Sequence, residues 1–82
     1  MATMKLSTLR NAVIELLAGA ADDNGYPNLR WLSVEELVEA IEDLAPLAVR
    51  GGADSDNLAF YSRVMKLAHA GGATEWSDTI RF

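Results

Sequence analysis

The sequence predicts an α+β domain that is mostly helical, with three helices followed by a short C-terminal β-hairpin. Three separate segments carry apolar residues at steps of three and four, which is typical of amphipathic helices. The last ten residues instead carry threonine, tryptophan, isoleucine and phenylalanine around Ser77-Asp78, which favours two strands. With 82 residues, we expect a single domain, 1–82, in the order helix, short strand, helix, helix, strand, strand.

The first helix is predicted over residues 6–20. Its apolar positions are Leu6, Leu9, Val13, Leu16, Leu17 and Ala20. Residues 22–27 have no apolar period and are rich in turn formers, so the chain should stop and reverse there. We expect a short extended segment over residues 29–32 before the second helix.

The second helix should begin at Val34. Ser33 and Glu36 have the spacing of a capping box, in which the serine hydroxyl and the glutamate carboxylate each accept from the other residue's backbone amide. The expected apolar face is Val34, Leu37, Val38, Ile41 and Leu44. Pro46 should bound this helix, since the residue before a proline disfavours helical angles. The stretch 45–55 is then either a functional loop or a loop that hides a short helical turn near residues 47–50.

The third helix should begin near Asp56, with Ser55 as its cap, and end at Gly71-Gly72. Its apolar stripe is Phe60, Val64 and Leu67, broadened by Leu58, Tyr61 and Met65. Residues 73–76 and 79–82 should pair through a three-residue loop.

In that hairpin Trp76 lies opposite Ile80 on the inner face, and Glu75 lies opposite Arg81 outside. Trp31 and Trp76 are both expected in the core, because a small domain needs large apolar side chains. An exposed tryptophan would instead mark a partner interface.

The composition argues against several classes of function. The chain has no cysteine and one histidine, His69, which we expect to favour a helix end, so we expect no metal site. No phosphate-loop or dinucleotide glycine pattern and no nucleophile with a base is evident, so we expect no cofactor and no enzyme. No apolar run approaches a membrane span, and the start lacks an apolar signal core, which indicates a cytoplasmic protein.

The net charge of −5 is concentrated in one segment, because residues 33–44 alone carry a net charge of −5. The acids of this segment are Glu35, Glu36, Glu39, Glu42 and Asp43. An acidic chain is a poor nonspecific binder of nucleic acid, but the face that each charge occupies decides what it binds.

Two segments, RWLSVEELVEAI and NLAFYSRVMKLAHAGGATEW, carry a resemblance that covers residues 6–82. The second is similar to a recognition helix with apolar residues seven and four positions before a glycine, here Val64 and Leu67 before Gly71. The chain thus resembles the winged helix-turn-helix DNA-binding domains. The resemblance implies a transcriptional regulator whose third helix enters the major groove of double-stranded DNA. We expect such a regulator to work as a homodimer, because one small module rarely supplies enough affinity.

Carried onto this chain, the resemblance implies a DNA-binding set on the third helix and the hairpin. These residues are Asn57, Ser62, Arg63, Lys66 and Arg81. Arg63 would contact guanine and Asn57 adenine, while Ser62 or Lys66 would contact phosphate.

The acids of the second helix depart from that pattern, because in the family this helix approaches the DNA backbone. The hairpin tip, Ser77-Asp78, also lacks basic residues, and the connection 45–55 is long. Two alternatives therefore stay open. One is a protein-protein interaction module whose contact surface is either the acids of the second helix, including Glu35, Glu39 and Glu42, or the 45–55 loop. The other is an acidic inhibitor that occupies a nucleic-acid groove of another protein.

Overall fold

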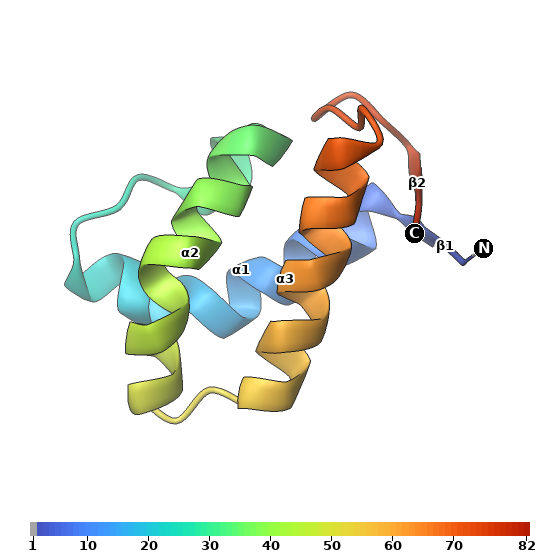
Figure 1. Ribbon diagram of the computed structural model, residues 1–82. Coiled ribbons are helices and arrows are strands. Elements are labelled where there is room, and N and C mark those ends of the chain that lie inside the picture. The colour runs from blue at the N-terminus through green and yellow to red at the C-terminus, as the bar shows by residue number, and fades with distance from the viewer. Residues whose placement is uncertain (1) are drawn as a thin grey trace.

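The computed structural model describes residues 2–82 and confirms a mostly helical α+β fold with three helices and a two-stranded antiparallel sheet (Figure 1). The elements are β1 (Thr3–Lys5), α1 (Leu6–Asp23), the 3-10 helix η1 (Leu29–Trp31), α2 (Val34–Arg50), α3 (Ser55–Ala70) and β2 (Thr79–Arg81). Helices α2 and α3 lie side by side in opposite directions, and α1 crosses both of them (Figure 1).

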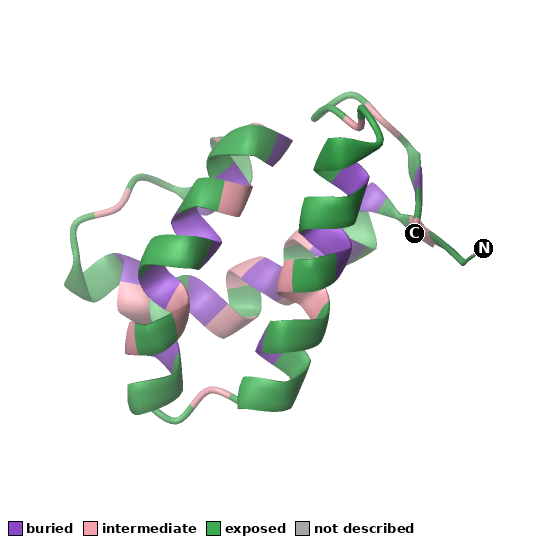
Figure 2. Cartoon of the chain, viewed as in Figure 1, coloured by how far each residue is buried: buried purple, intermediate pink, exposed green. Residues whose placement is uncertain are grey.

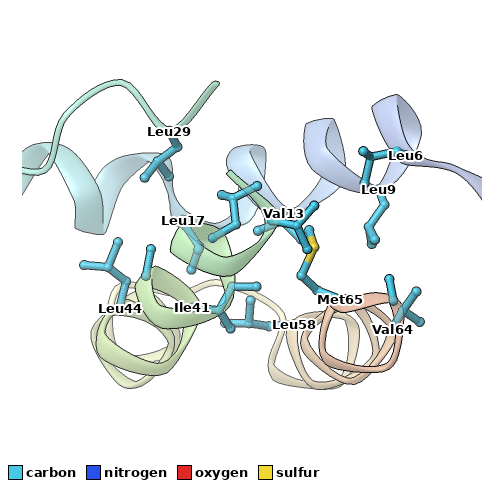
Figure 3. Packing of buried hydrophobic residues seen from close by; sticks show 14 of the residues in the cluster. Leu6, Leu9, Val13, Leu17, Leu29, Ile41, Leu44, Leu58, Val64 and Met65 are labelled. Carbon is cyan, nitrogen blue, oxygen red and sulfur yellow. The ribbon is translucent and has the colours of Figure 1, made fainter. Parts of the chain in front are cut away.

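The core lies where α1 crosses the α2–α3 pair. Leu9, Val13 and Leu17 form the buried stripe of α1, and they face the buried side chains of the other two helices (Figure 3). Those helices contribute Leu37, Ile41, Leu44, Leu58, Val64 and Met65. The buried residues follow the inner faces of the helices (Figure 2), and within residues 2–82 none of them is polar or charged. Hydrophobic burial therefore holds the three helices together.

The predicted capping box at the start of α2 is confirmed. The amide of Glu36 donates to Oγ of Ser33 at 3.1 Å, and the amide of Ser33 donates to Oε1 of Glu36 at 3.0 Å. The bond from the Ser33 amide, followed by the bond with its side chain, lowers the pKa of the Glu36 carboxyl. Because the bonds favour the carboxylate, the box is complete above the ordinary glutamate pKa and weakens as the pH falls through the lowered one.

The expected end of the second helix before Pro46 is wrong, because α2 continues to Arg50. Pro46 lies on the exposed side of α2, where its ring displaces only one backbone hydrogen bond. On the inner side Leu44 and Ala48 are buried, and the burial of these side chains favours continuation of the helix past Pro46. The connection from α2 to α3 is therefore residues 51–54, in which Gly52 takes a φ of 103°.

Helix α3 begins one residue earlier than predicted, and its cap is Asp54 rather than Ser55. Oδ1 of Asp54 accepts from the amides of Asp56 at 2.9 Å and Asn57 at 3.1 Å. The expected apolar stripe is wrong at two positions, since Phe60 is 40% exposed and Leu67 is 47% exposed. The reason is that α3 packs against both α1 and α2, which centres its buried face on Leu58, Met65 and Ala68.

The predicted C-terminal hairpin is also wrong, because β2 pairs with the N-terminal strand β1. The partners are Thr3 with Arg81, Met4 with Ile80 and Lys5 with Thr79, so Glu75 does not lie opposite Arg81. The segment expected as strand 73–76 instead contains a tight turn. In it the Ser77 amide donates to the Thr74 carbonyl oxygen at 3.0 Å, and the Thr74 amide donates to Oγ of Ser77 at 3.0 Å.

The short strand expected at residues 29–32 is wrong as well, since this segment forms η1. Oδ1 of Asn28 accepts from the Arg30 amide at 3.0 Å, and the Leu32 amide donates to the Leu29 carbonyl oxygen at 3.2 Å. These local bonds satisfy backbone groups that would have no neighbouring strand here. Leu29 is buried against the core as a result.

Leu37→Ala should lower the free energy of unfolding by about 2–5 kcal/mol, because it leaves a cavity in the core. Phe60→Ala should cost clearly less, since 40% of Phe60 is already exposed. Urea denaturation of both variants at the same low protein concentration measures the difference. Equal losses at the two positions would contradict the observed orientation of α3.

Candidate interaction surfaces

The residues predicted to contact DNA do not lie together on one face of the structure. Asn57 and Arg63 are both exposed on α3, but six positions turn their side chains about 120° apart around the helix axis. Asn57 lines a shallow depression with Leu16 and Tyr61, between α1 and α3. Ser62 is half-buried on the side of α3 that faces α2. Of these three residues of α3, Arg63 is the one that points outward, away from the other helices.

Lys66, which was predicted to contact DNA, forms an ion pair with Glu42, which was predicted to contact a protein partner. Nζ of Lys66 lies 3.4 Å from Oε1 of Glu42, and both side chains are about half exposed. Such an exposed pair contributes only about 0–1 kcal/mol to stability. Its position matters more, because a phosphate that approached Lys66 would also meet the Glu42 carboxylate. Within residues 2–82 this is the single ion pair.

Arg81 lies apart from the α3 set, on β2. It is exposed, and its strand partner is Thr3 of β1. The wing that the resemblance implied around residues 73–82 is therefore replaced by a sheet formed from the two ends of the described chain. Arg81 faces solvent from that sheet rather than from the tip of a hairpin.

The remaining acids of α2, after Glu36 of the capping box and Glu42 of the ion pair, differ in their surroundings. Glu35 and Glu39 are exposed on the side of α2 away from the core. Asp43 instead accepts a hydrogen bond from Tyr26, whose Oη lies 2.7 Å from Oδ2 of Asp43. This bond raises the pKa of Tyr26, and desolvation and the charges of Asp43 and Glu39 raise it further. Asp43 thus fastens the loop before η1 to α2.

The two tryptophans are not in the core, contrary to the prediction. Trp31 is 84% exposed and Trp76 is 85% exposed. Trp31 ends η1, and Trp76 lies in the turn that follows α3. Neither residue falls on the apolar stripe of a helix. Trp76 is followed directly by the turn formers Ser77 and Asp78, which was a signal for its exposure, whereas Trp31 lies between Arg30 and Leu32 and had no such signal.

Hydrogen bonds fix the backbone on both sides of Trp31. Nη2 of Arg10 donates to the carbonyl oxygen of Arg30 at 2.7 Å and to that of Leu32 at 2.6 Å. Arg30 in turn donates from Nη1 to Oδ1 of Asn11 at 3.3 Å. The first half of α1 therefore holds η1 in place while the indole of Trp31 stays in solvent.

Trp76 is presented in a similar way. Its amide donates to Oγ1 of Thr74 at 3.3 Å, within the turn that Thr74 and Ser77 close. This turn lies at the end of the molecule where α2 begins (Figure 1). Both tryptophans thus extend from short, hydrogen-bonded segments rather than from long loops.

A shallow depression of about 420 Å³ lies along the first half of α1, between these two segments. Arg10, Arg30 and Trp76 are among its lining residues, and Trp31 directly follows Arg30 in the chain. We refer to Arg10, Arg30, Trp31 and Trp76 as the tryptophan surface. It combines two exposed indoles with two guanidinium groups whose positions are set by hydrogen bonds and by the wall of the depression.

Residues 2–82 contain no group of three or more His, Cys, Asp or Glu side chains placed to hold a metal ion. None of the helices in that range has both the length and the apolar character needed to cross a membrane. No protein-family model, curated protein or solved structure matches the chain.

Asp43→Asn should lower the pKa of Tyr26 toward the ordinary tyrosine value, because the hydrogen bond to the Asp43 carboxylate is the largest cause of the raised pKa. The bond requires a protonated phenol, so its contribution to stability is lost as the pH rises through the raised pKa. An NMR titration of the Tyr26 ring measures the change. Glu39→Gln is the matched control and should have a smaller effect, because Glu39 acts only through its charge. Equal effects of the two variants would contradict the role of Asp43.

Proposed function

We propose that this protein is a non-catalytic protein-interaction module that binds another protein through the tryptophan surface. The observation that carries the proposal is the exposure of Trp31 and Trp76, at 84% and 85%. Tryptophan buries more apolar area than other side chains and is enriched among the residues that dominate binding energy at interfaces. A small domain that leaves both of its tryptophans in solvent has gained no folding stability from them.

The way in which the indoles are held supports this proposal. The two bonds from Arg10 to the backbone on either side of Trp31, and the bonds within the 74–77 turn, restrict both backbone segments before any partner arrives. Binding through ordered segments avoids much of the entropy cost of fixing a loop. Arginine is also enriched at interfaces, and Arg30 directly precedes Trp31 in the chain.

The charges of the molecule favour a protein partner over duplex DNA. The net charge is −5, and Lys66 on α3 is matched by Glu42. The outer side of α3 carries Phe60 and Leu67 next to Arg63, whereas DNA-binding surfaces are strongly basic. Each of these features lowers the attraction for phosphate and leaves apolar contact as the main source of affinity.

The double variant Trp31→Ala/Trp76→Ala should lose the partner and keep its fold, because both side chains are almost fully exposed. The test is affinity purification from the source cells, followed by binding measurements with the purified partner. We expect the affinity to fall by at least about tenfold, as for a loss of one interface hot spot.

Val49→Ala is the matched control, since Val49 is an exposed apolar residue near the other end of α2. The control should bind like the unmodified protein, and thermal unfolding should show that all three proteins are folded. A partner retained equally by the double tryptophan variant would overturn the proposal. A parallel Glu35→Gln/Glu39→Gln variant shows whether the exposed acids of α2 take part.

Duplex DNA is a second candidate partner, and one specific observation favours it. The connection between α2 and α3 is four residues, 51–54, which is close to the short turn of a helix-turn-helix. In this arrangement Arg63 is the outward residue of α3 that would contact a base.

A fluorescence titration with duplex DNA at about 50 and about 200 mM salt tests this candidate, because phosphate contacts give a log-log slope of about −0.9 each. Arg63→Ala should weaken binding severalfold if α3 enters the groove. Arg50→Ala, on another helix, is the charge-matched control. Absence of binding at the lower salt would remove DNA as a partner.

A further inference from the structure

The outer face of α3 carries two large apolar residues that the fold leaves partly in solvent. Phe60 is 40% exposed and Leu67 is 47% exposed. Seven positions separate them, so they lie on the same stripe of the helix, two turns apart. The ring of Phe60 packs edge-to-face against Tyr61 at 5.3 Å and Phe82 at 6.4 Å, measured between ring centroids, which fixes its orientation.

Two opposite charges share this stripe with the apolar pair. Asp56 and Arg63 are also seven positions apart, and both are exposed. The order Asp56, Phe60, Arg63, Leu67 has steps of four, three and four, which is the spacing of a seam between two packed helices. Among residues 2–82, neither Asp56 nor Arg63 belongs to an ion pair.

This arrangement of charges is complementary to itself. When two copies of α3 pack in opposite directions about a two-fold axis near Phe60, Asp56 of each copy lies opposite Arg63 of the other. Parallel packing would instead place like charges together. We infer that the face of α3 formed by Asp56, Phe60, Arg63 and Leu67 is a dimer interface, and that its occupant is a second copy of this chain.

The inferred interface has an apolar centre flanked by two identical ion pairs. Burial of Phe60 near the two-fold axis supplies the attraction at this centre, and Leu67 extends the apolar stripe beyond each ion pair. The Asp56–Arg63 pairs select the antiparallel register. Duplex DNA fits the same face less well, since Asp56 would repel phosphate beside Arg63. One helix per copy buries a small area, so the dimer is weak and depends on protein concentration. This inference does not rest on the tryptophan surface, which lies on other elements.

Charge reversal tests the inference. Asp56→Arg and Arg63→Asp should each weaken dimerisation by at least about tenfold, because each places like charges opposite one another. The double variant Asp56→Arg/Arg63→Asp should recover the dimer. An equimolar mixture of the two single variants should also recover it, as a heterodimer, because one copy then carries two arginines and the other two aspartates at the facing positions.

Sedimentation equilibrium over a wide range of protein concentration measures each dissociation constant. Phe60→Ala should weaken the dimer, and Arg50→Asp, which reverses a charge on α2, should leave it unchanged. Circular dichroism checks that each variant is folded, since Asp56 lies in the first turn of α3. A chain that stays monomeric at its highest soluble concentration would overturn the inference. So would a dimer that ignores the single reversals, or one that neither the double variant nor the mixture restores.

Discussion

The crossing of α1 over the α2–α3 pair is the contact on which the rest of the structure depends. Leu9, Val13 and Leu17 are inaccessible to solvent there, and the facing residues are apolar throughout. An interior of this kind has no hydrogen bonds to fix the positions of the helices, so the shapes of the side chains do so. Met65 and Leu58 turn α3 toward α1 and α2, and this rotation brings Phe60, Arg63 and Leu67 to the outer surface.

Local interactions were predictable from the sequence, whereas structural features that depend on contacts between distant residues were not. Ser33 and Glu36 are three residues apart, so the cap of α2 could be predicted from chemistry within one turn. The end of α2 could not be predicted in this way, because the burial of Leu44 and Ala48 outweighs the local preference of Pro46 for ending a helix. The partner of β2 lies more than seventy positions away in a three-residue strand, which is too short to show alternation.

The candidate site was predictable only in part, for the same reason. The sequence analysis predicted that an exposed tryptophan would mark a partner interface, but it placed both tryptophans in the core. Which apolar residues are exposed follows from the rotation of α3 and from the turn at residues 74–77, and both depend on contacts between distant parts of the chain. A dimer through α3 would carry two tryptophan surfaces, and it would also cover Arg63. Self-association would therefore compete with the proposed DNA contact for one face of α3.

The pairing of β1 with β2 also determines how the fold would respond to force. The amide of Ala2 donates to the Phe82 carbonyl oxygen at 2.9 Å, and the Phe82 amide donates to the Ala2 carbonyl oxygen at 3.0 Å. Because the strands are antiparallel and these two residues face each other, tension applied at both would open the ladder one bond at a time rather than shear all bonds together. The sheet would then separate at low force, before the load reached the helical core.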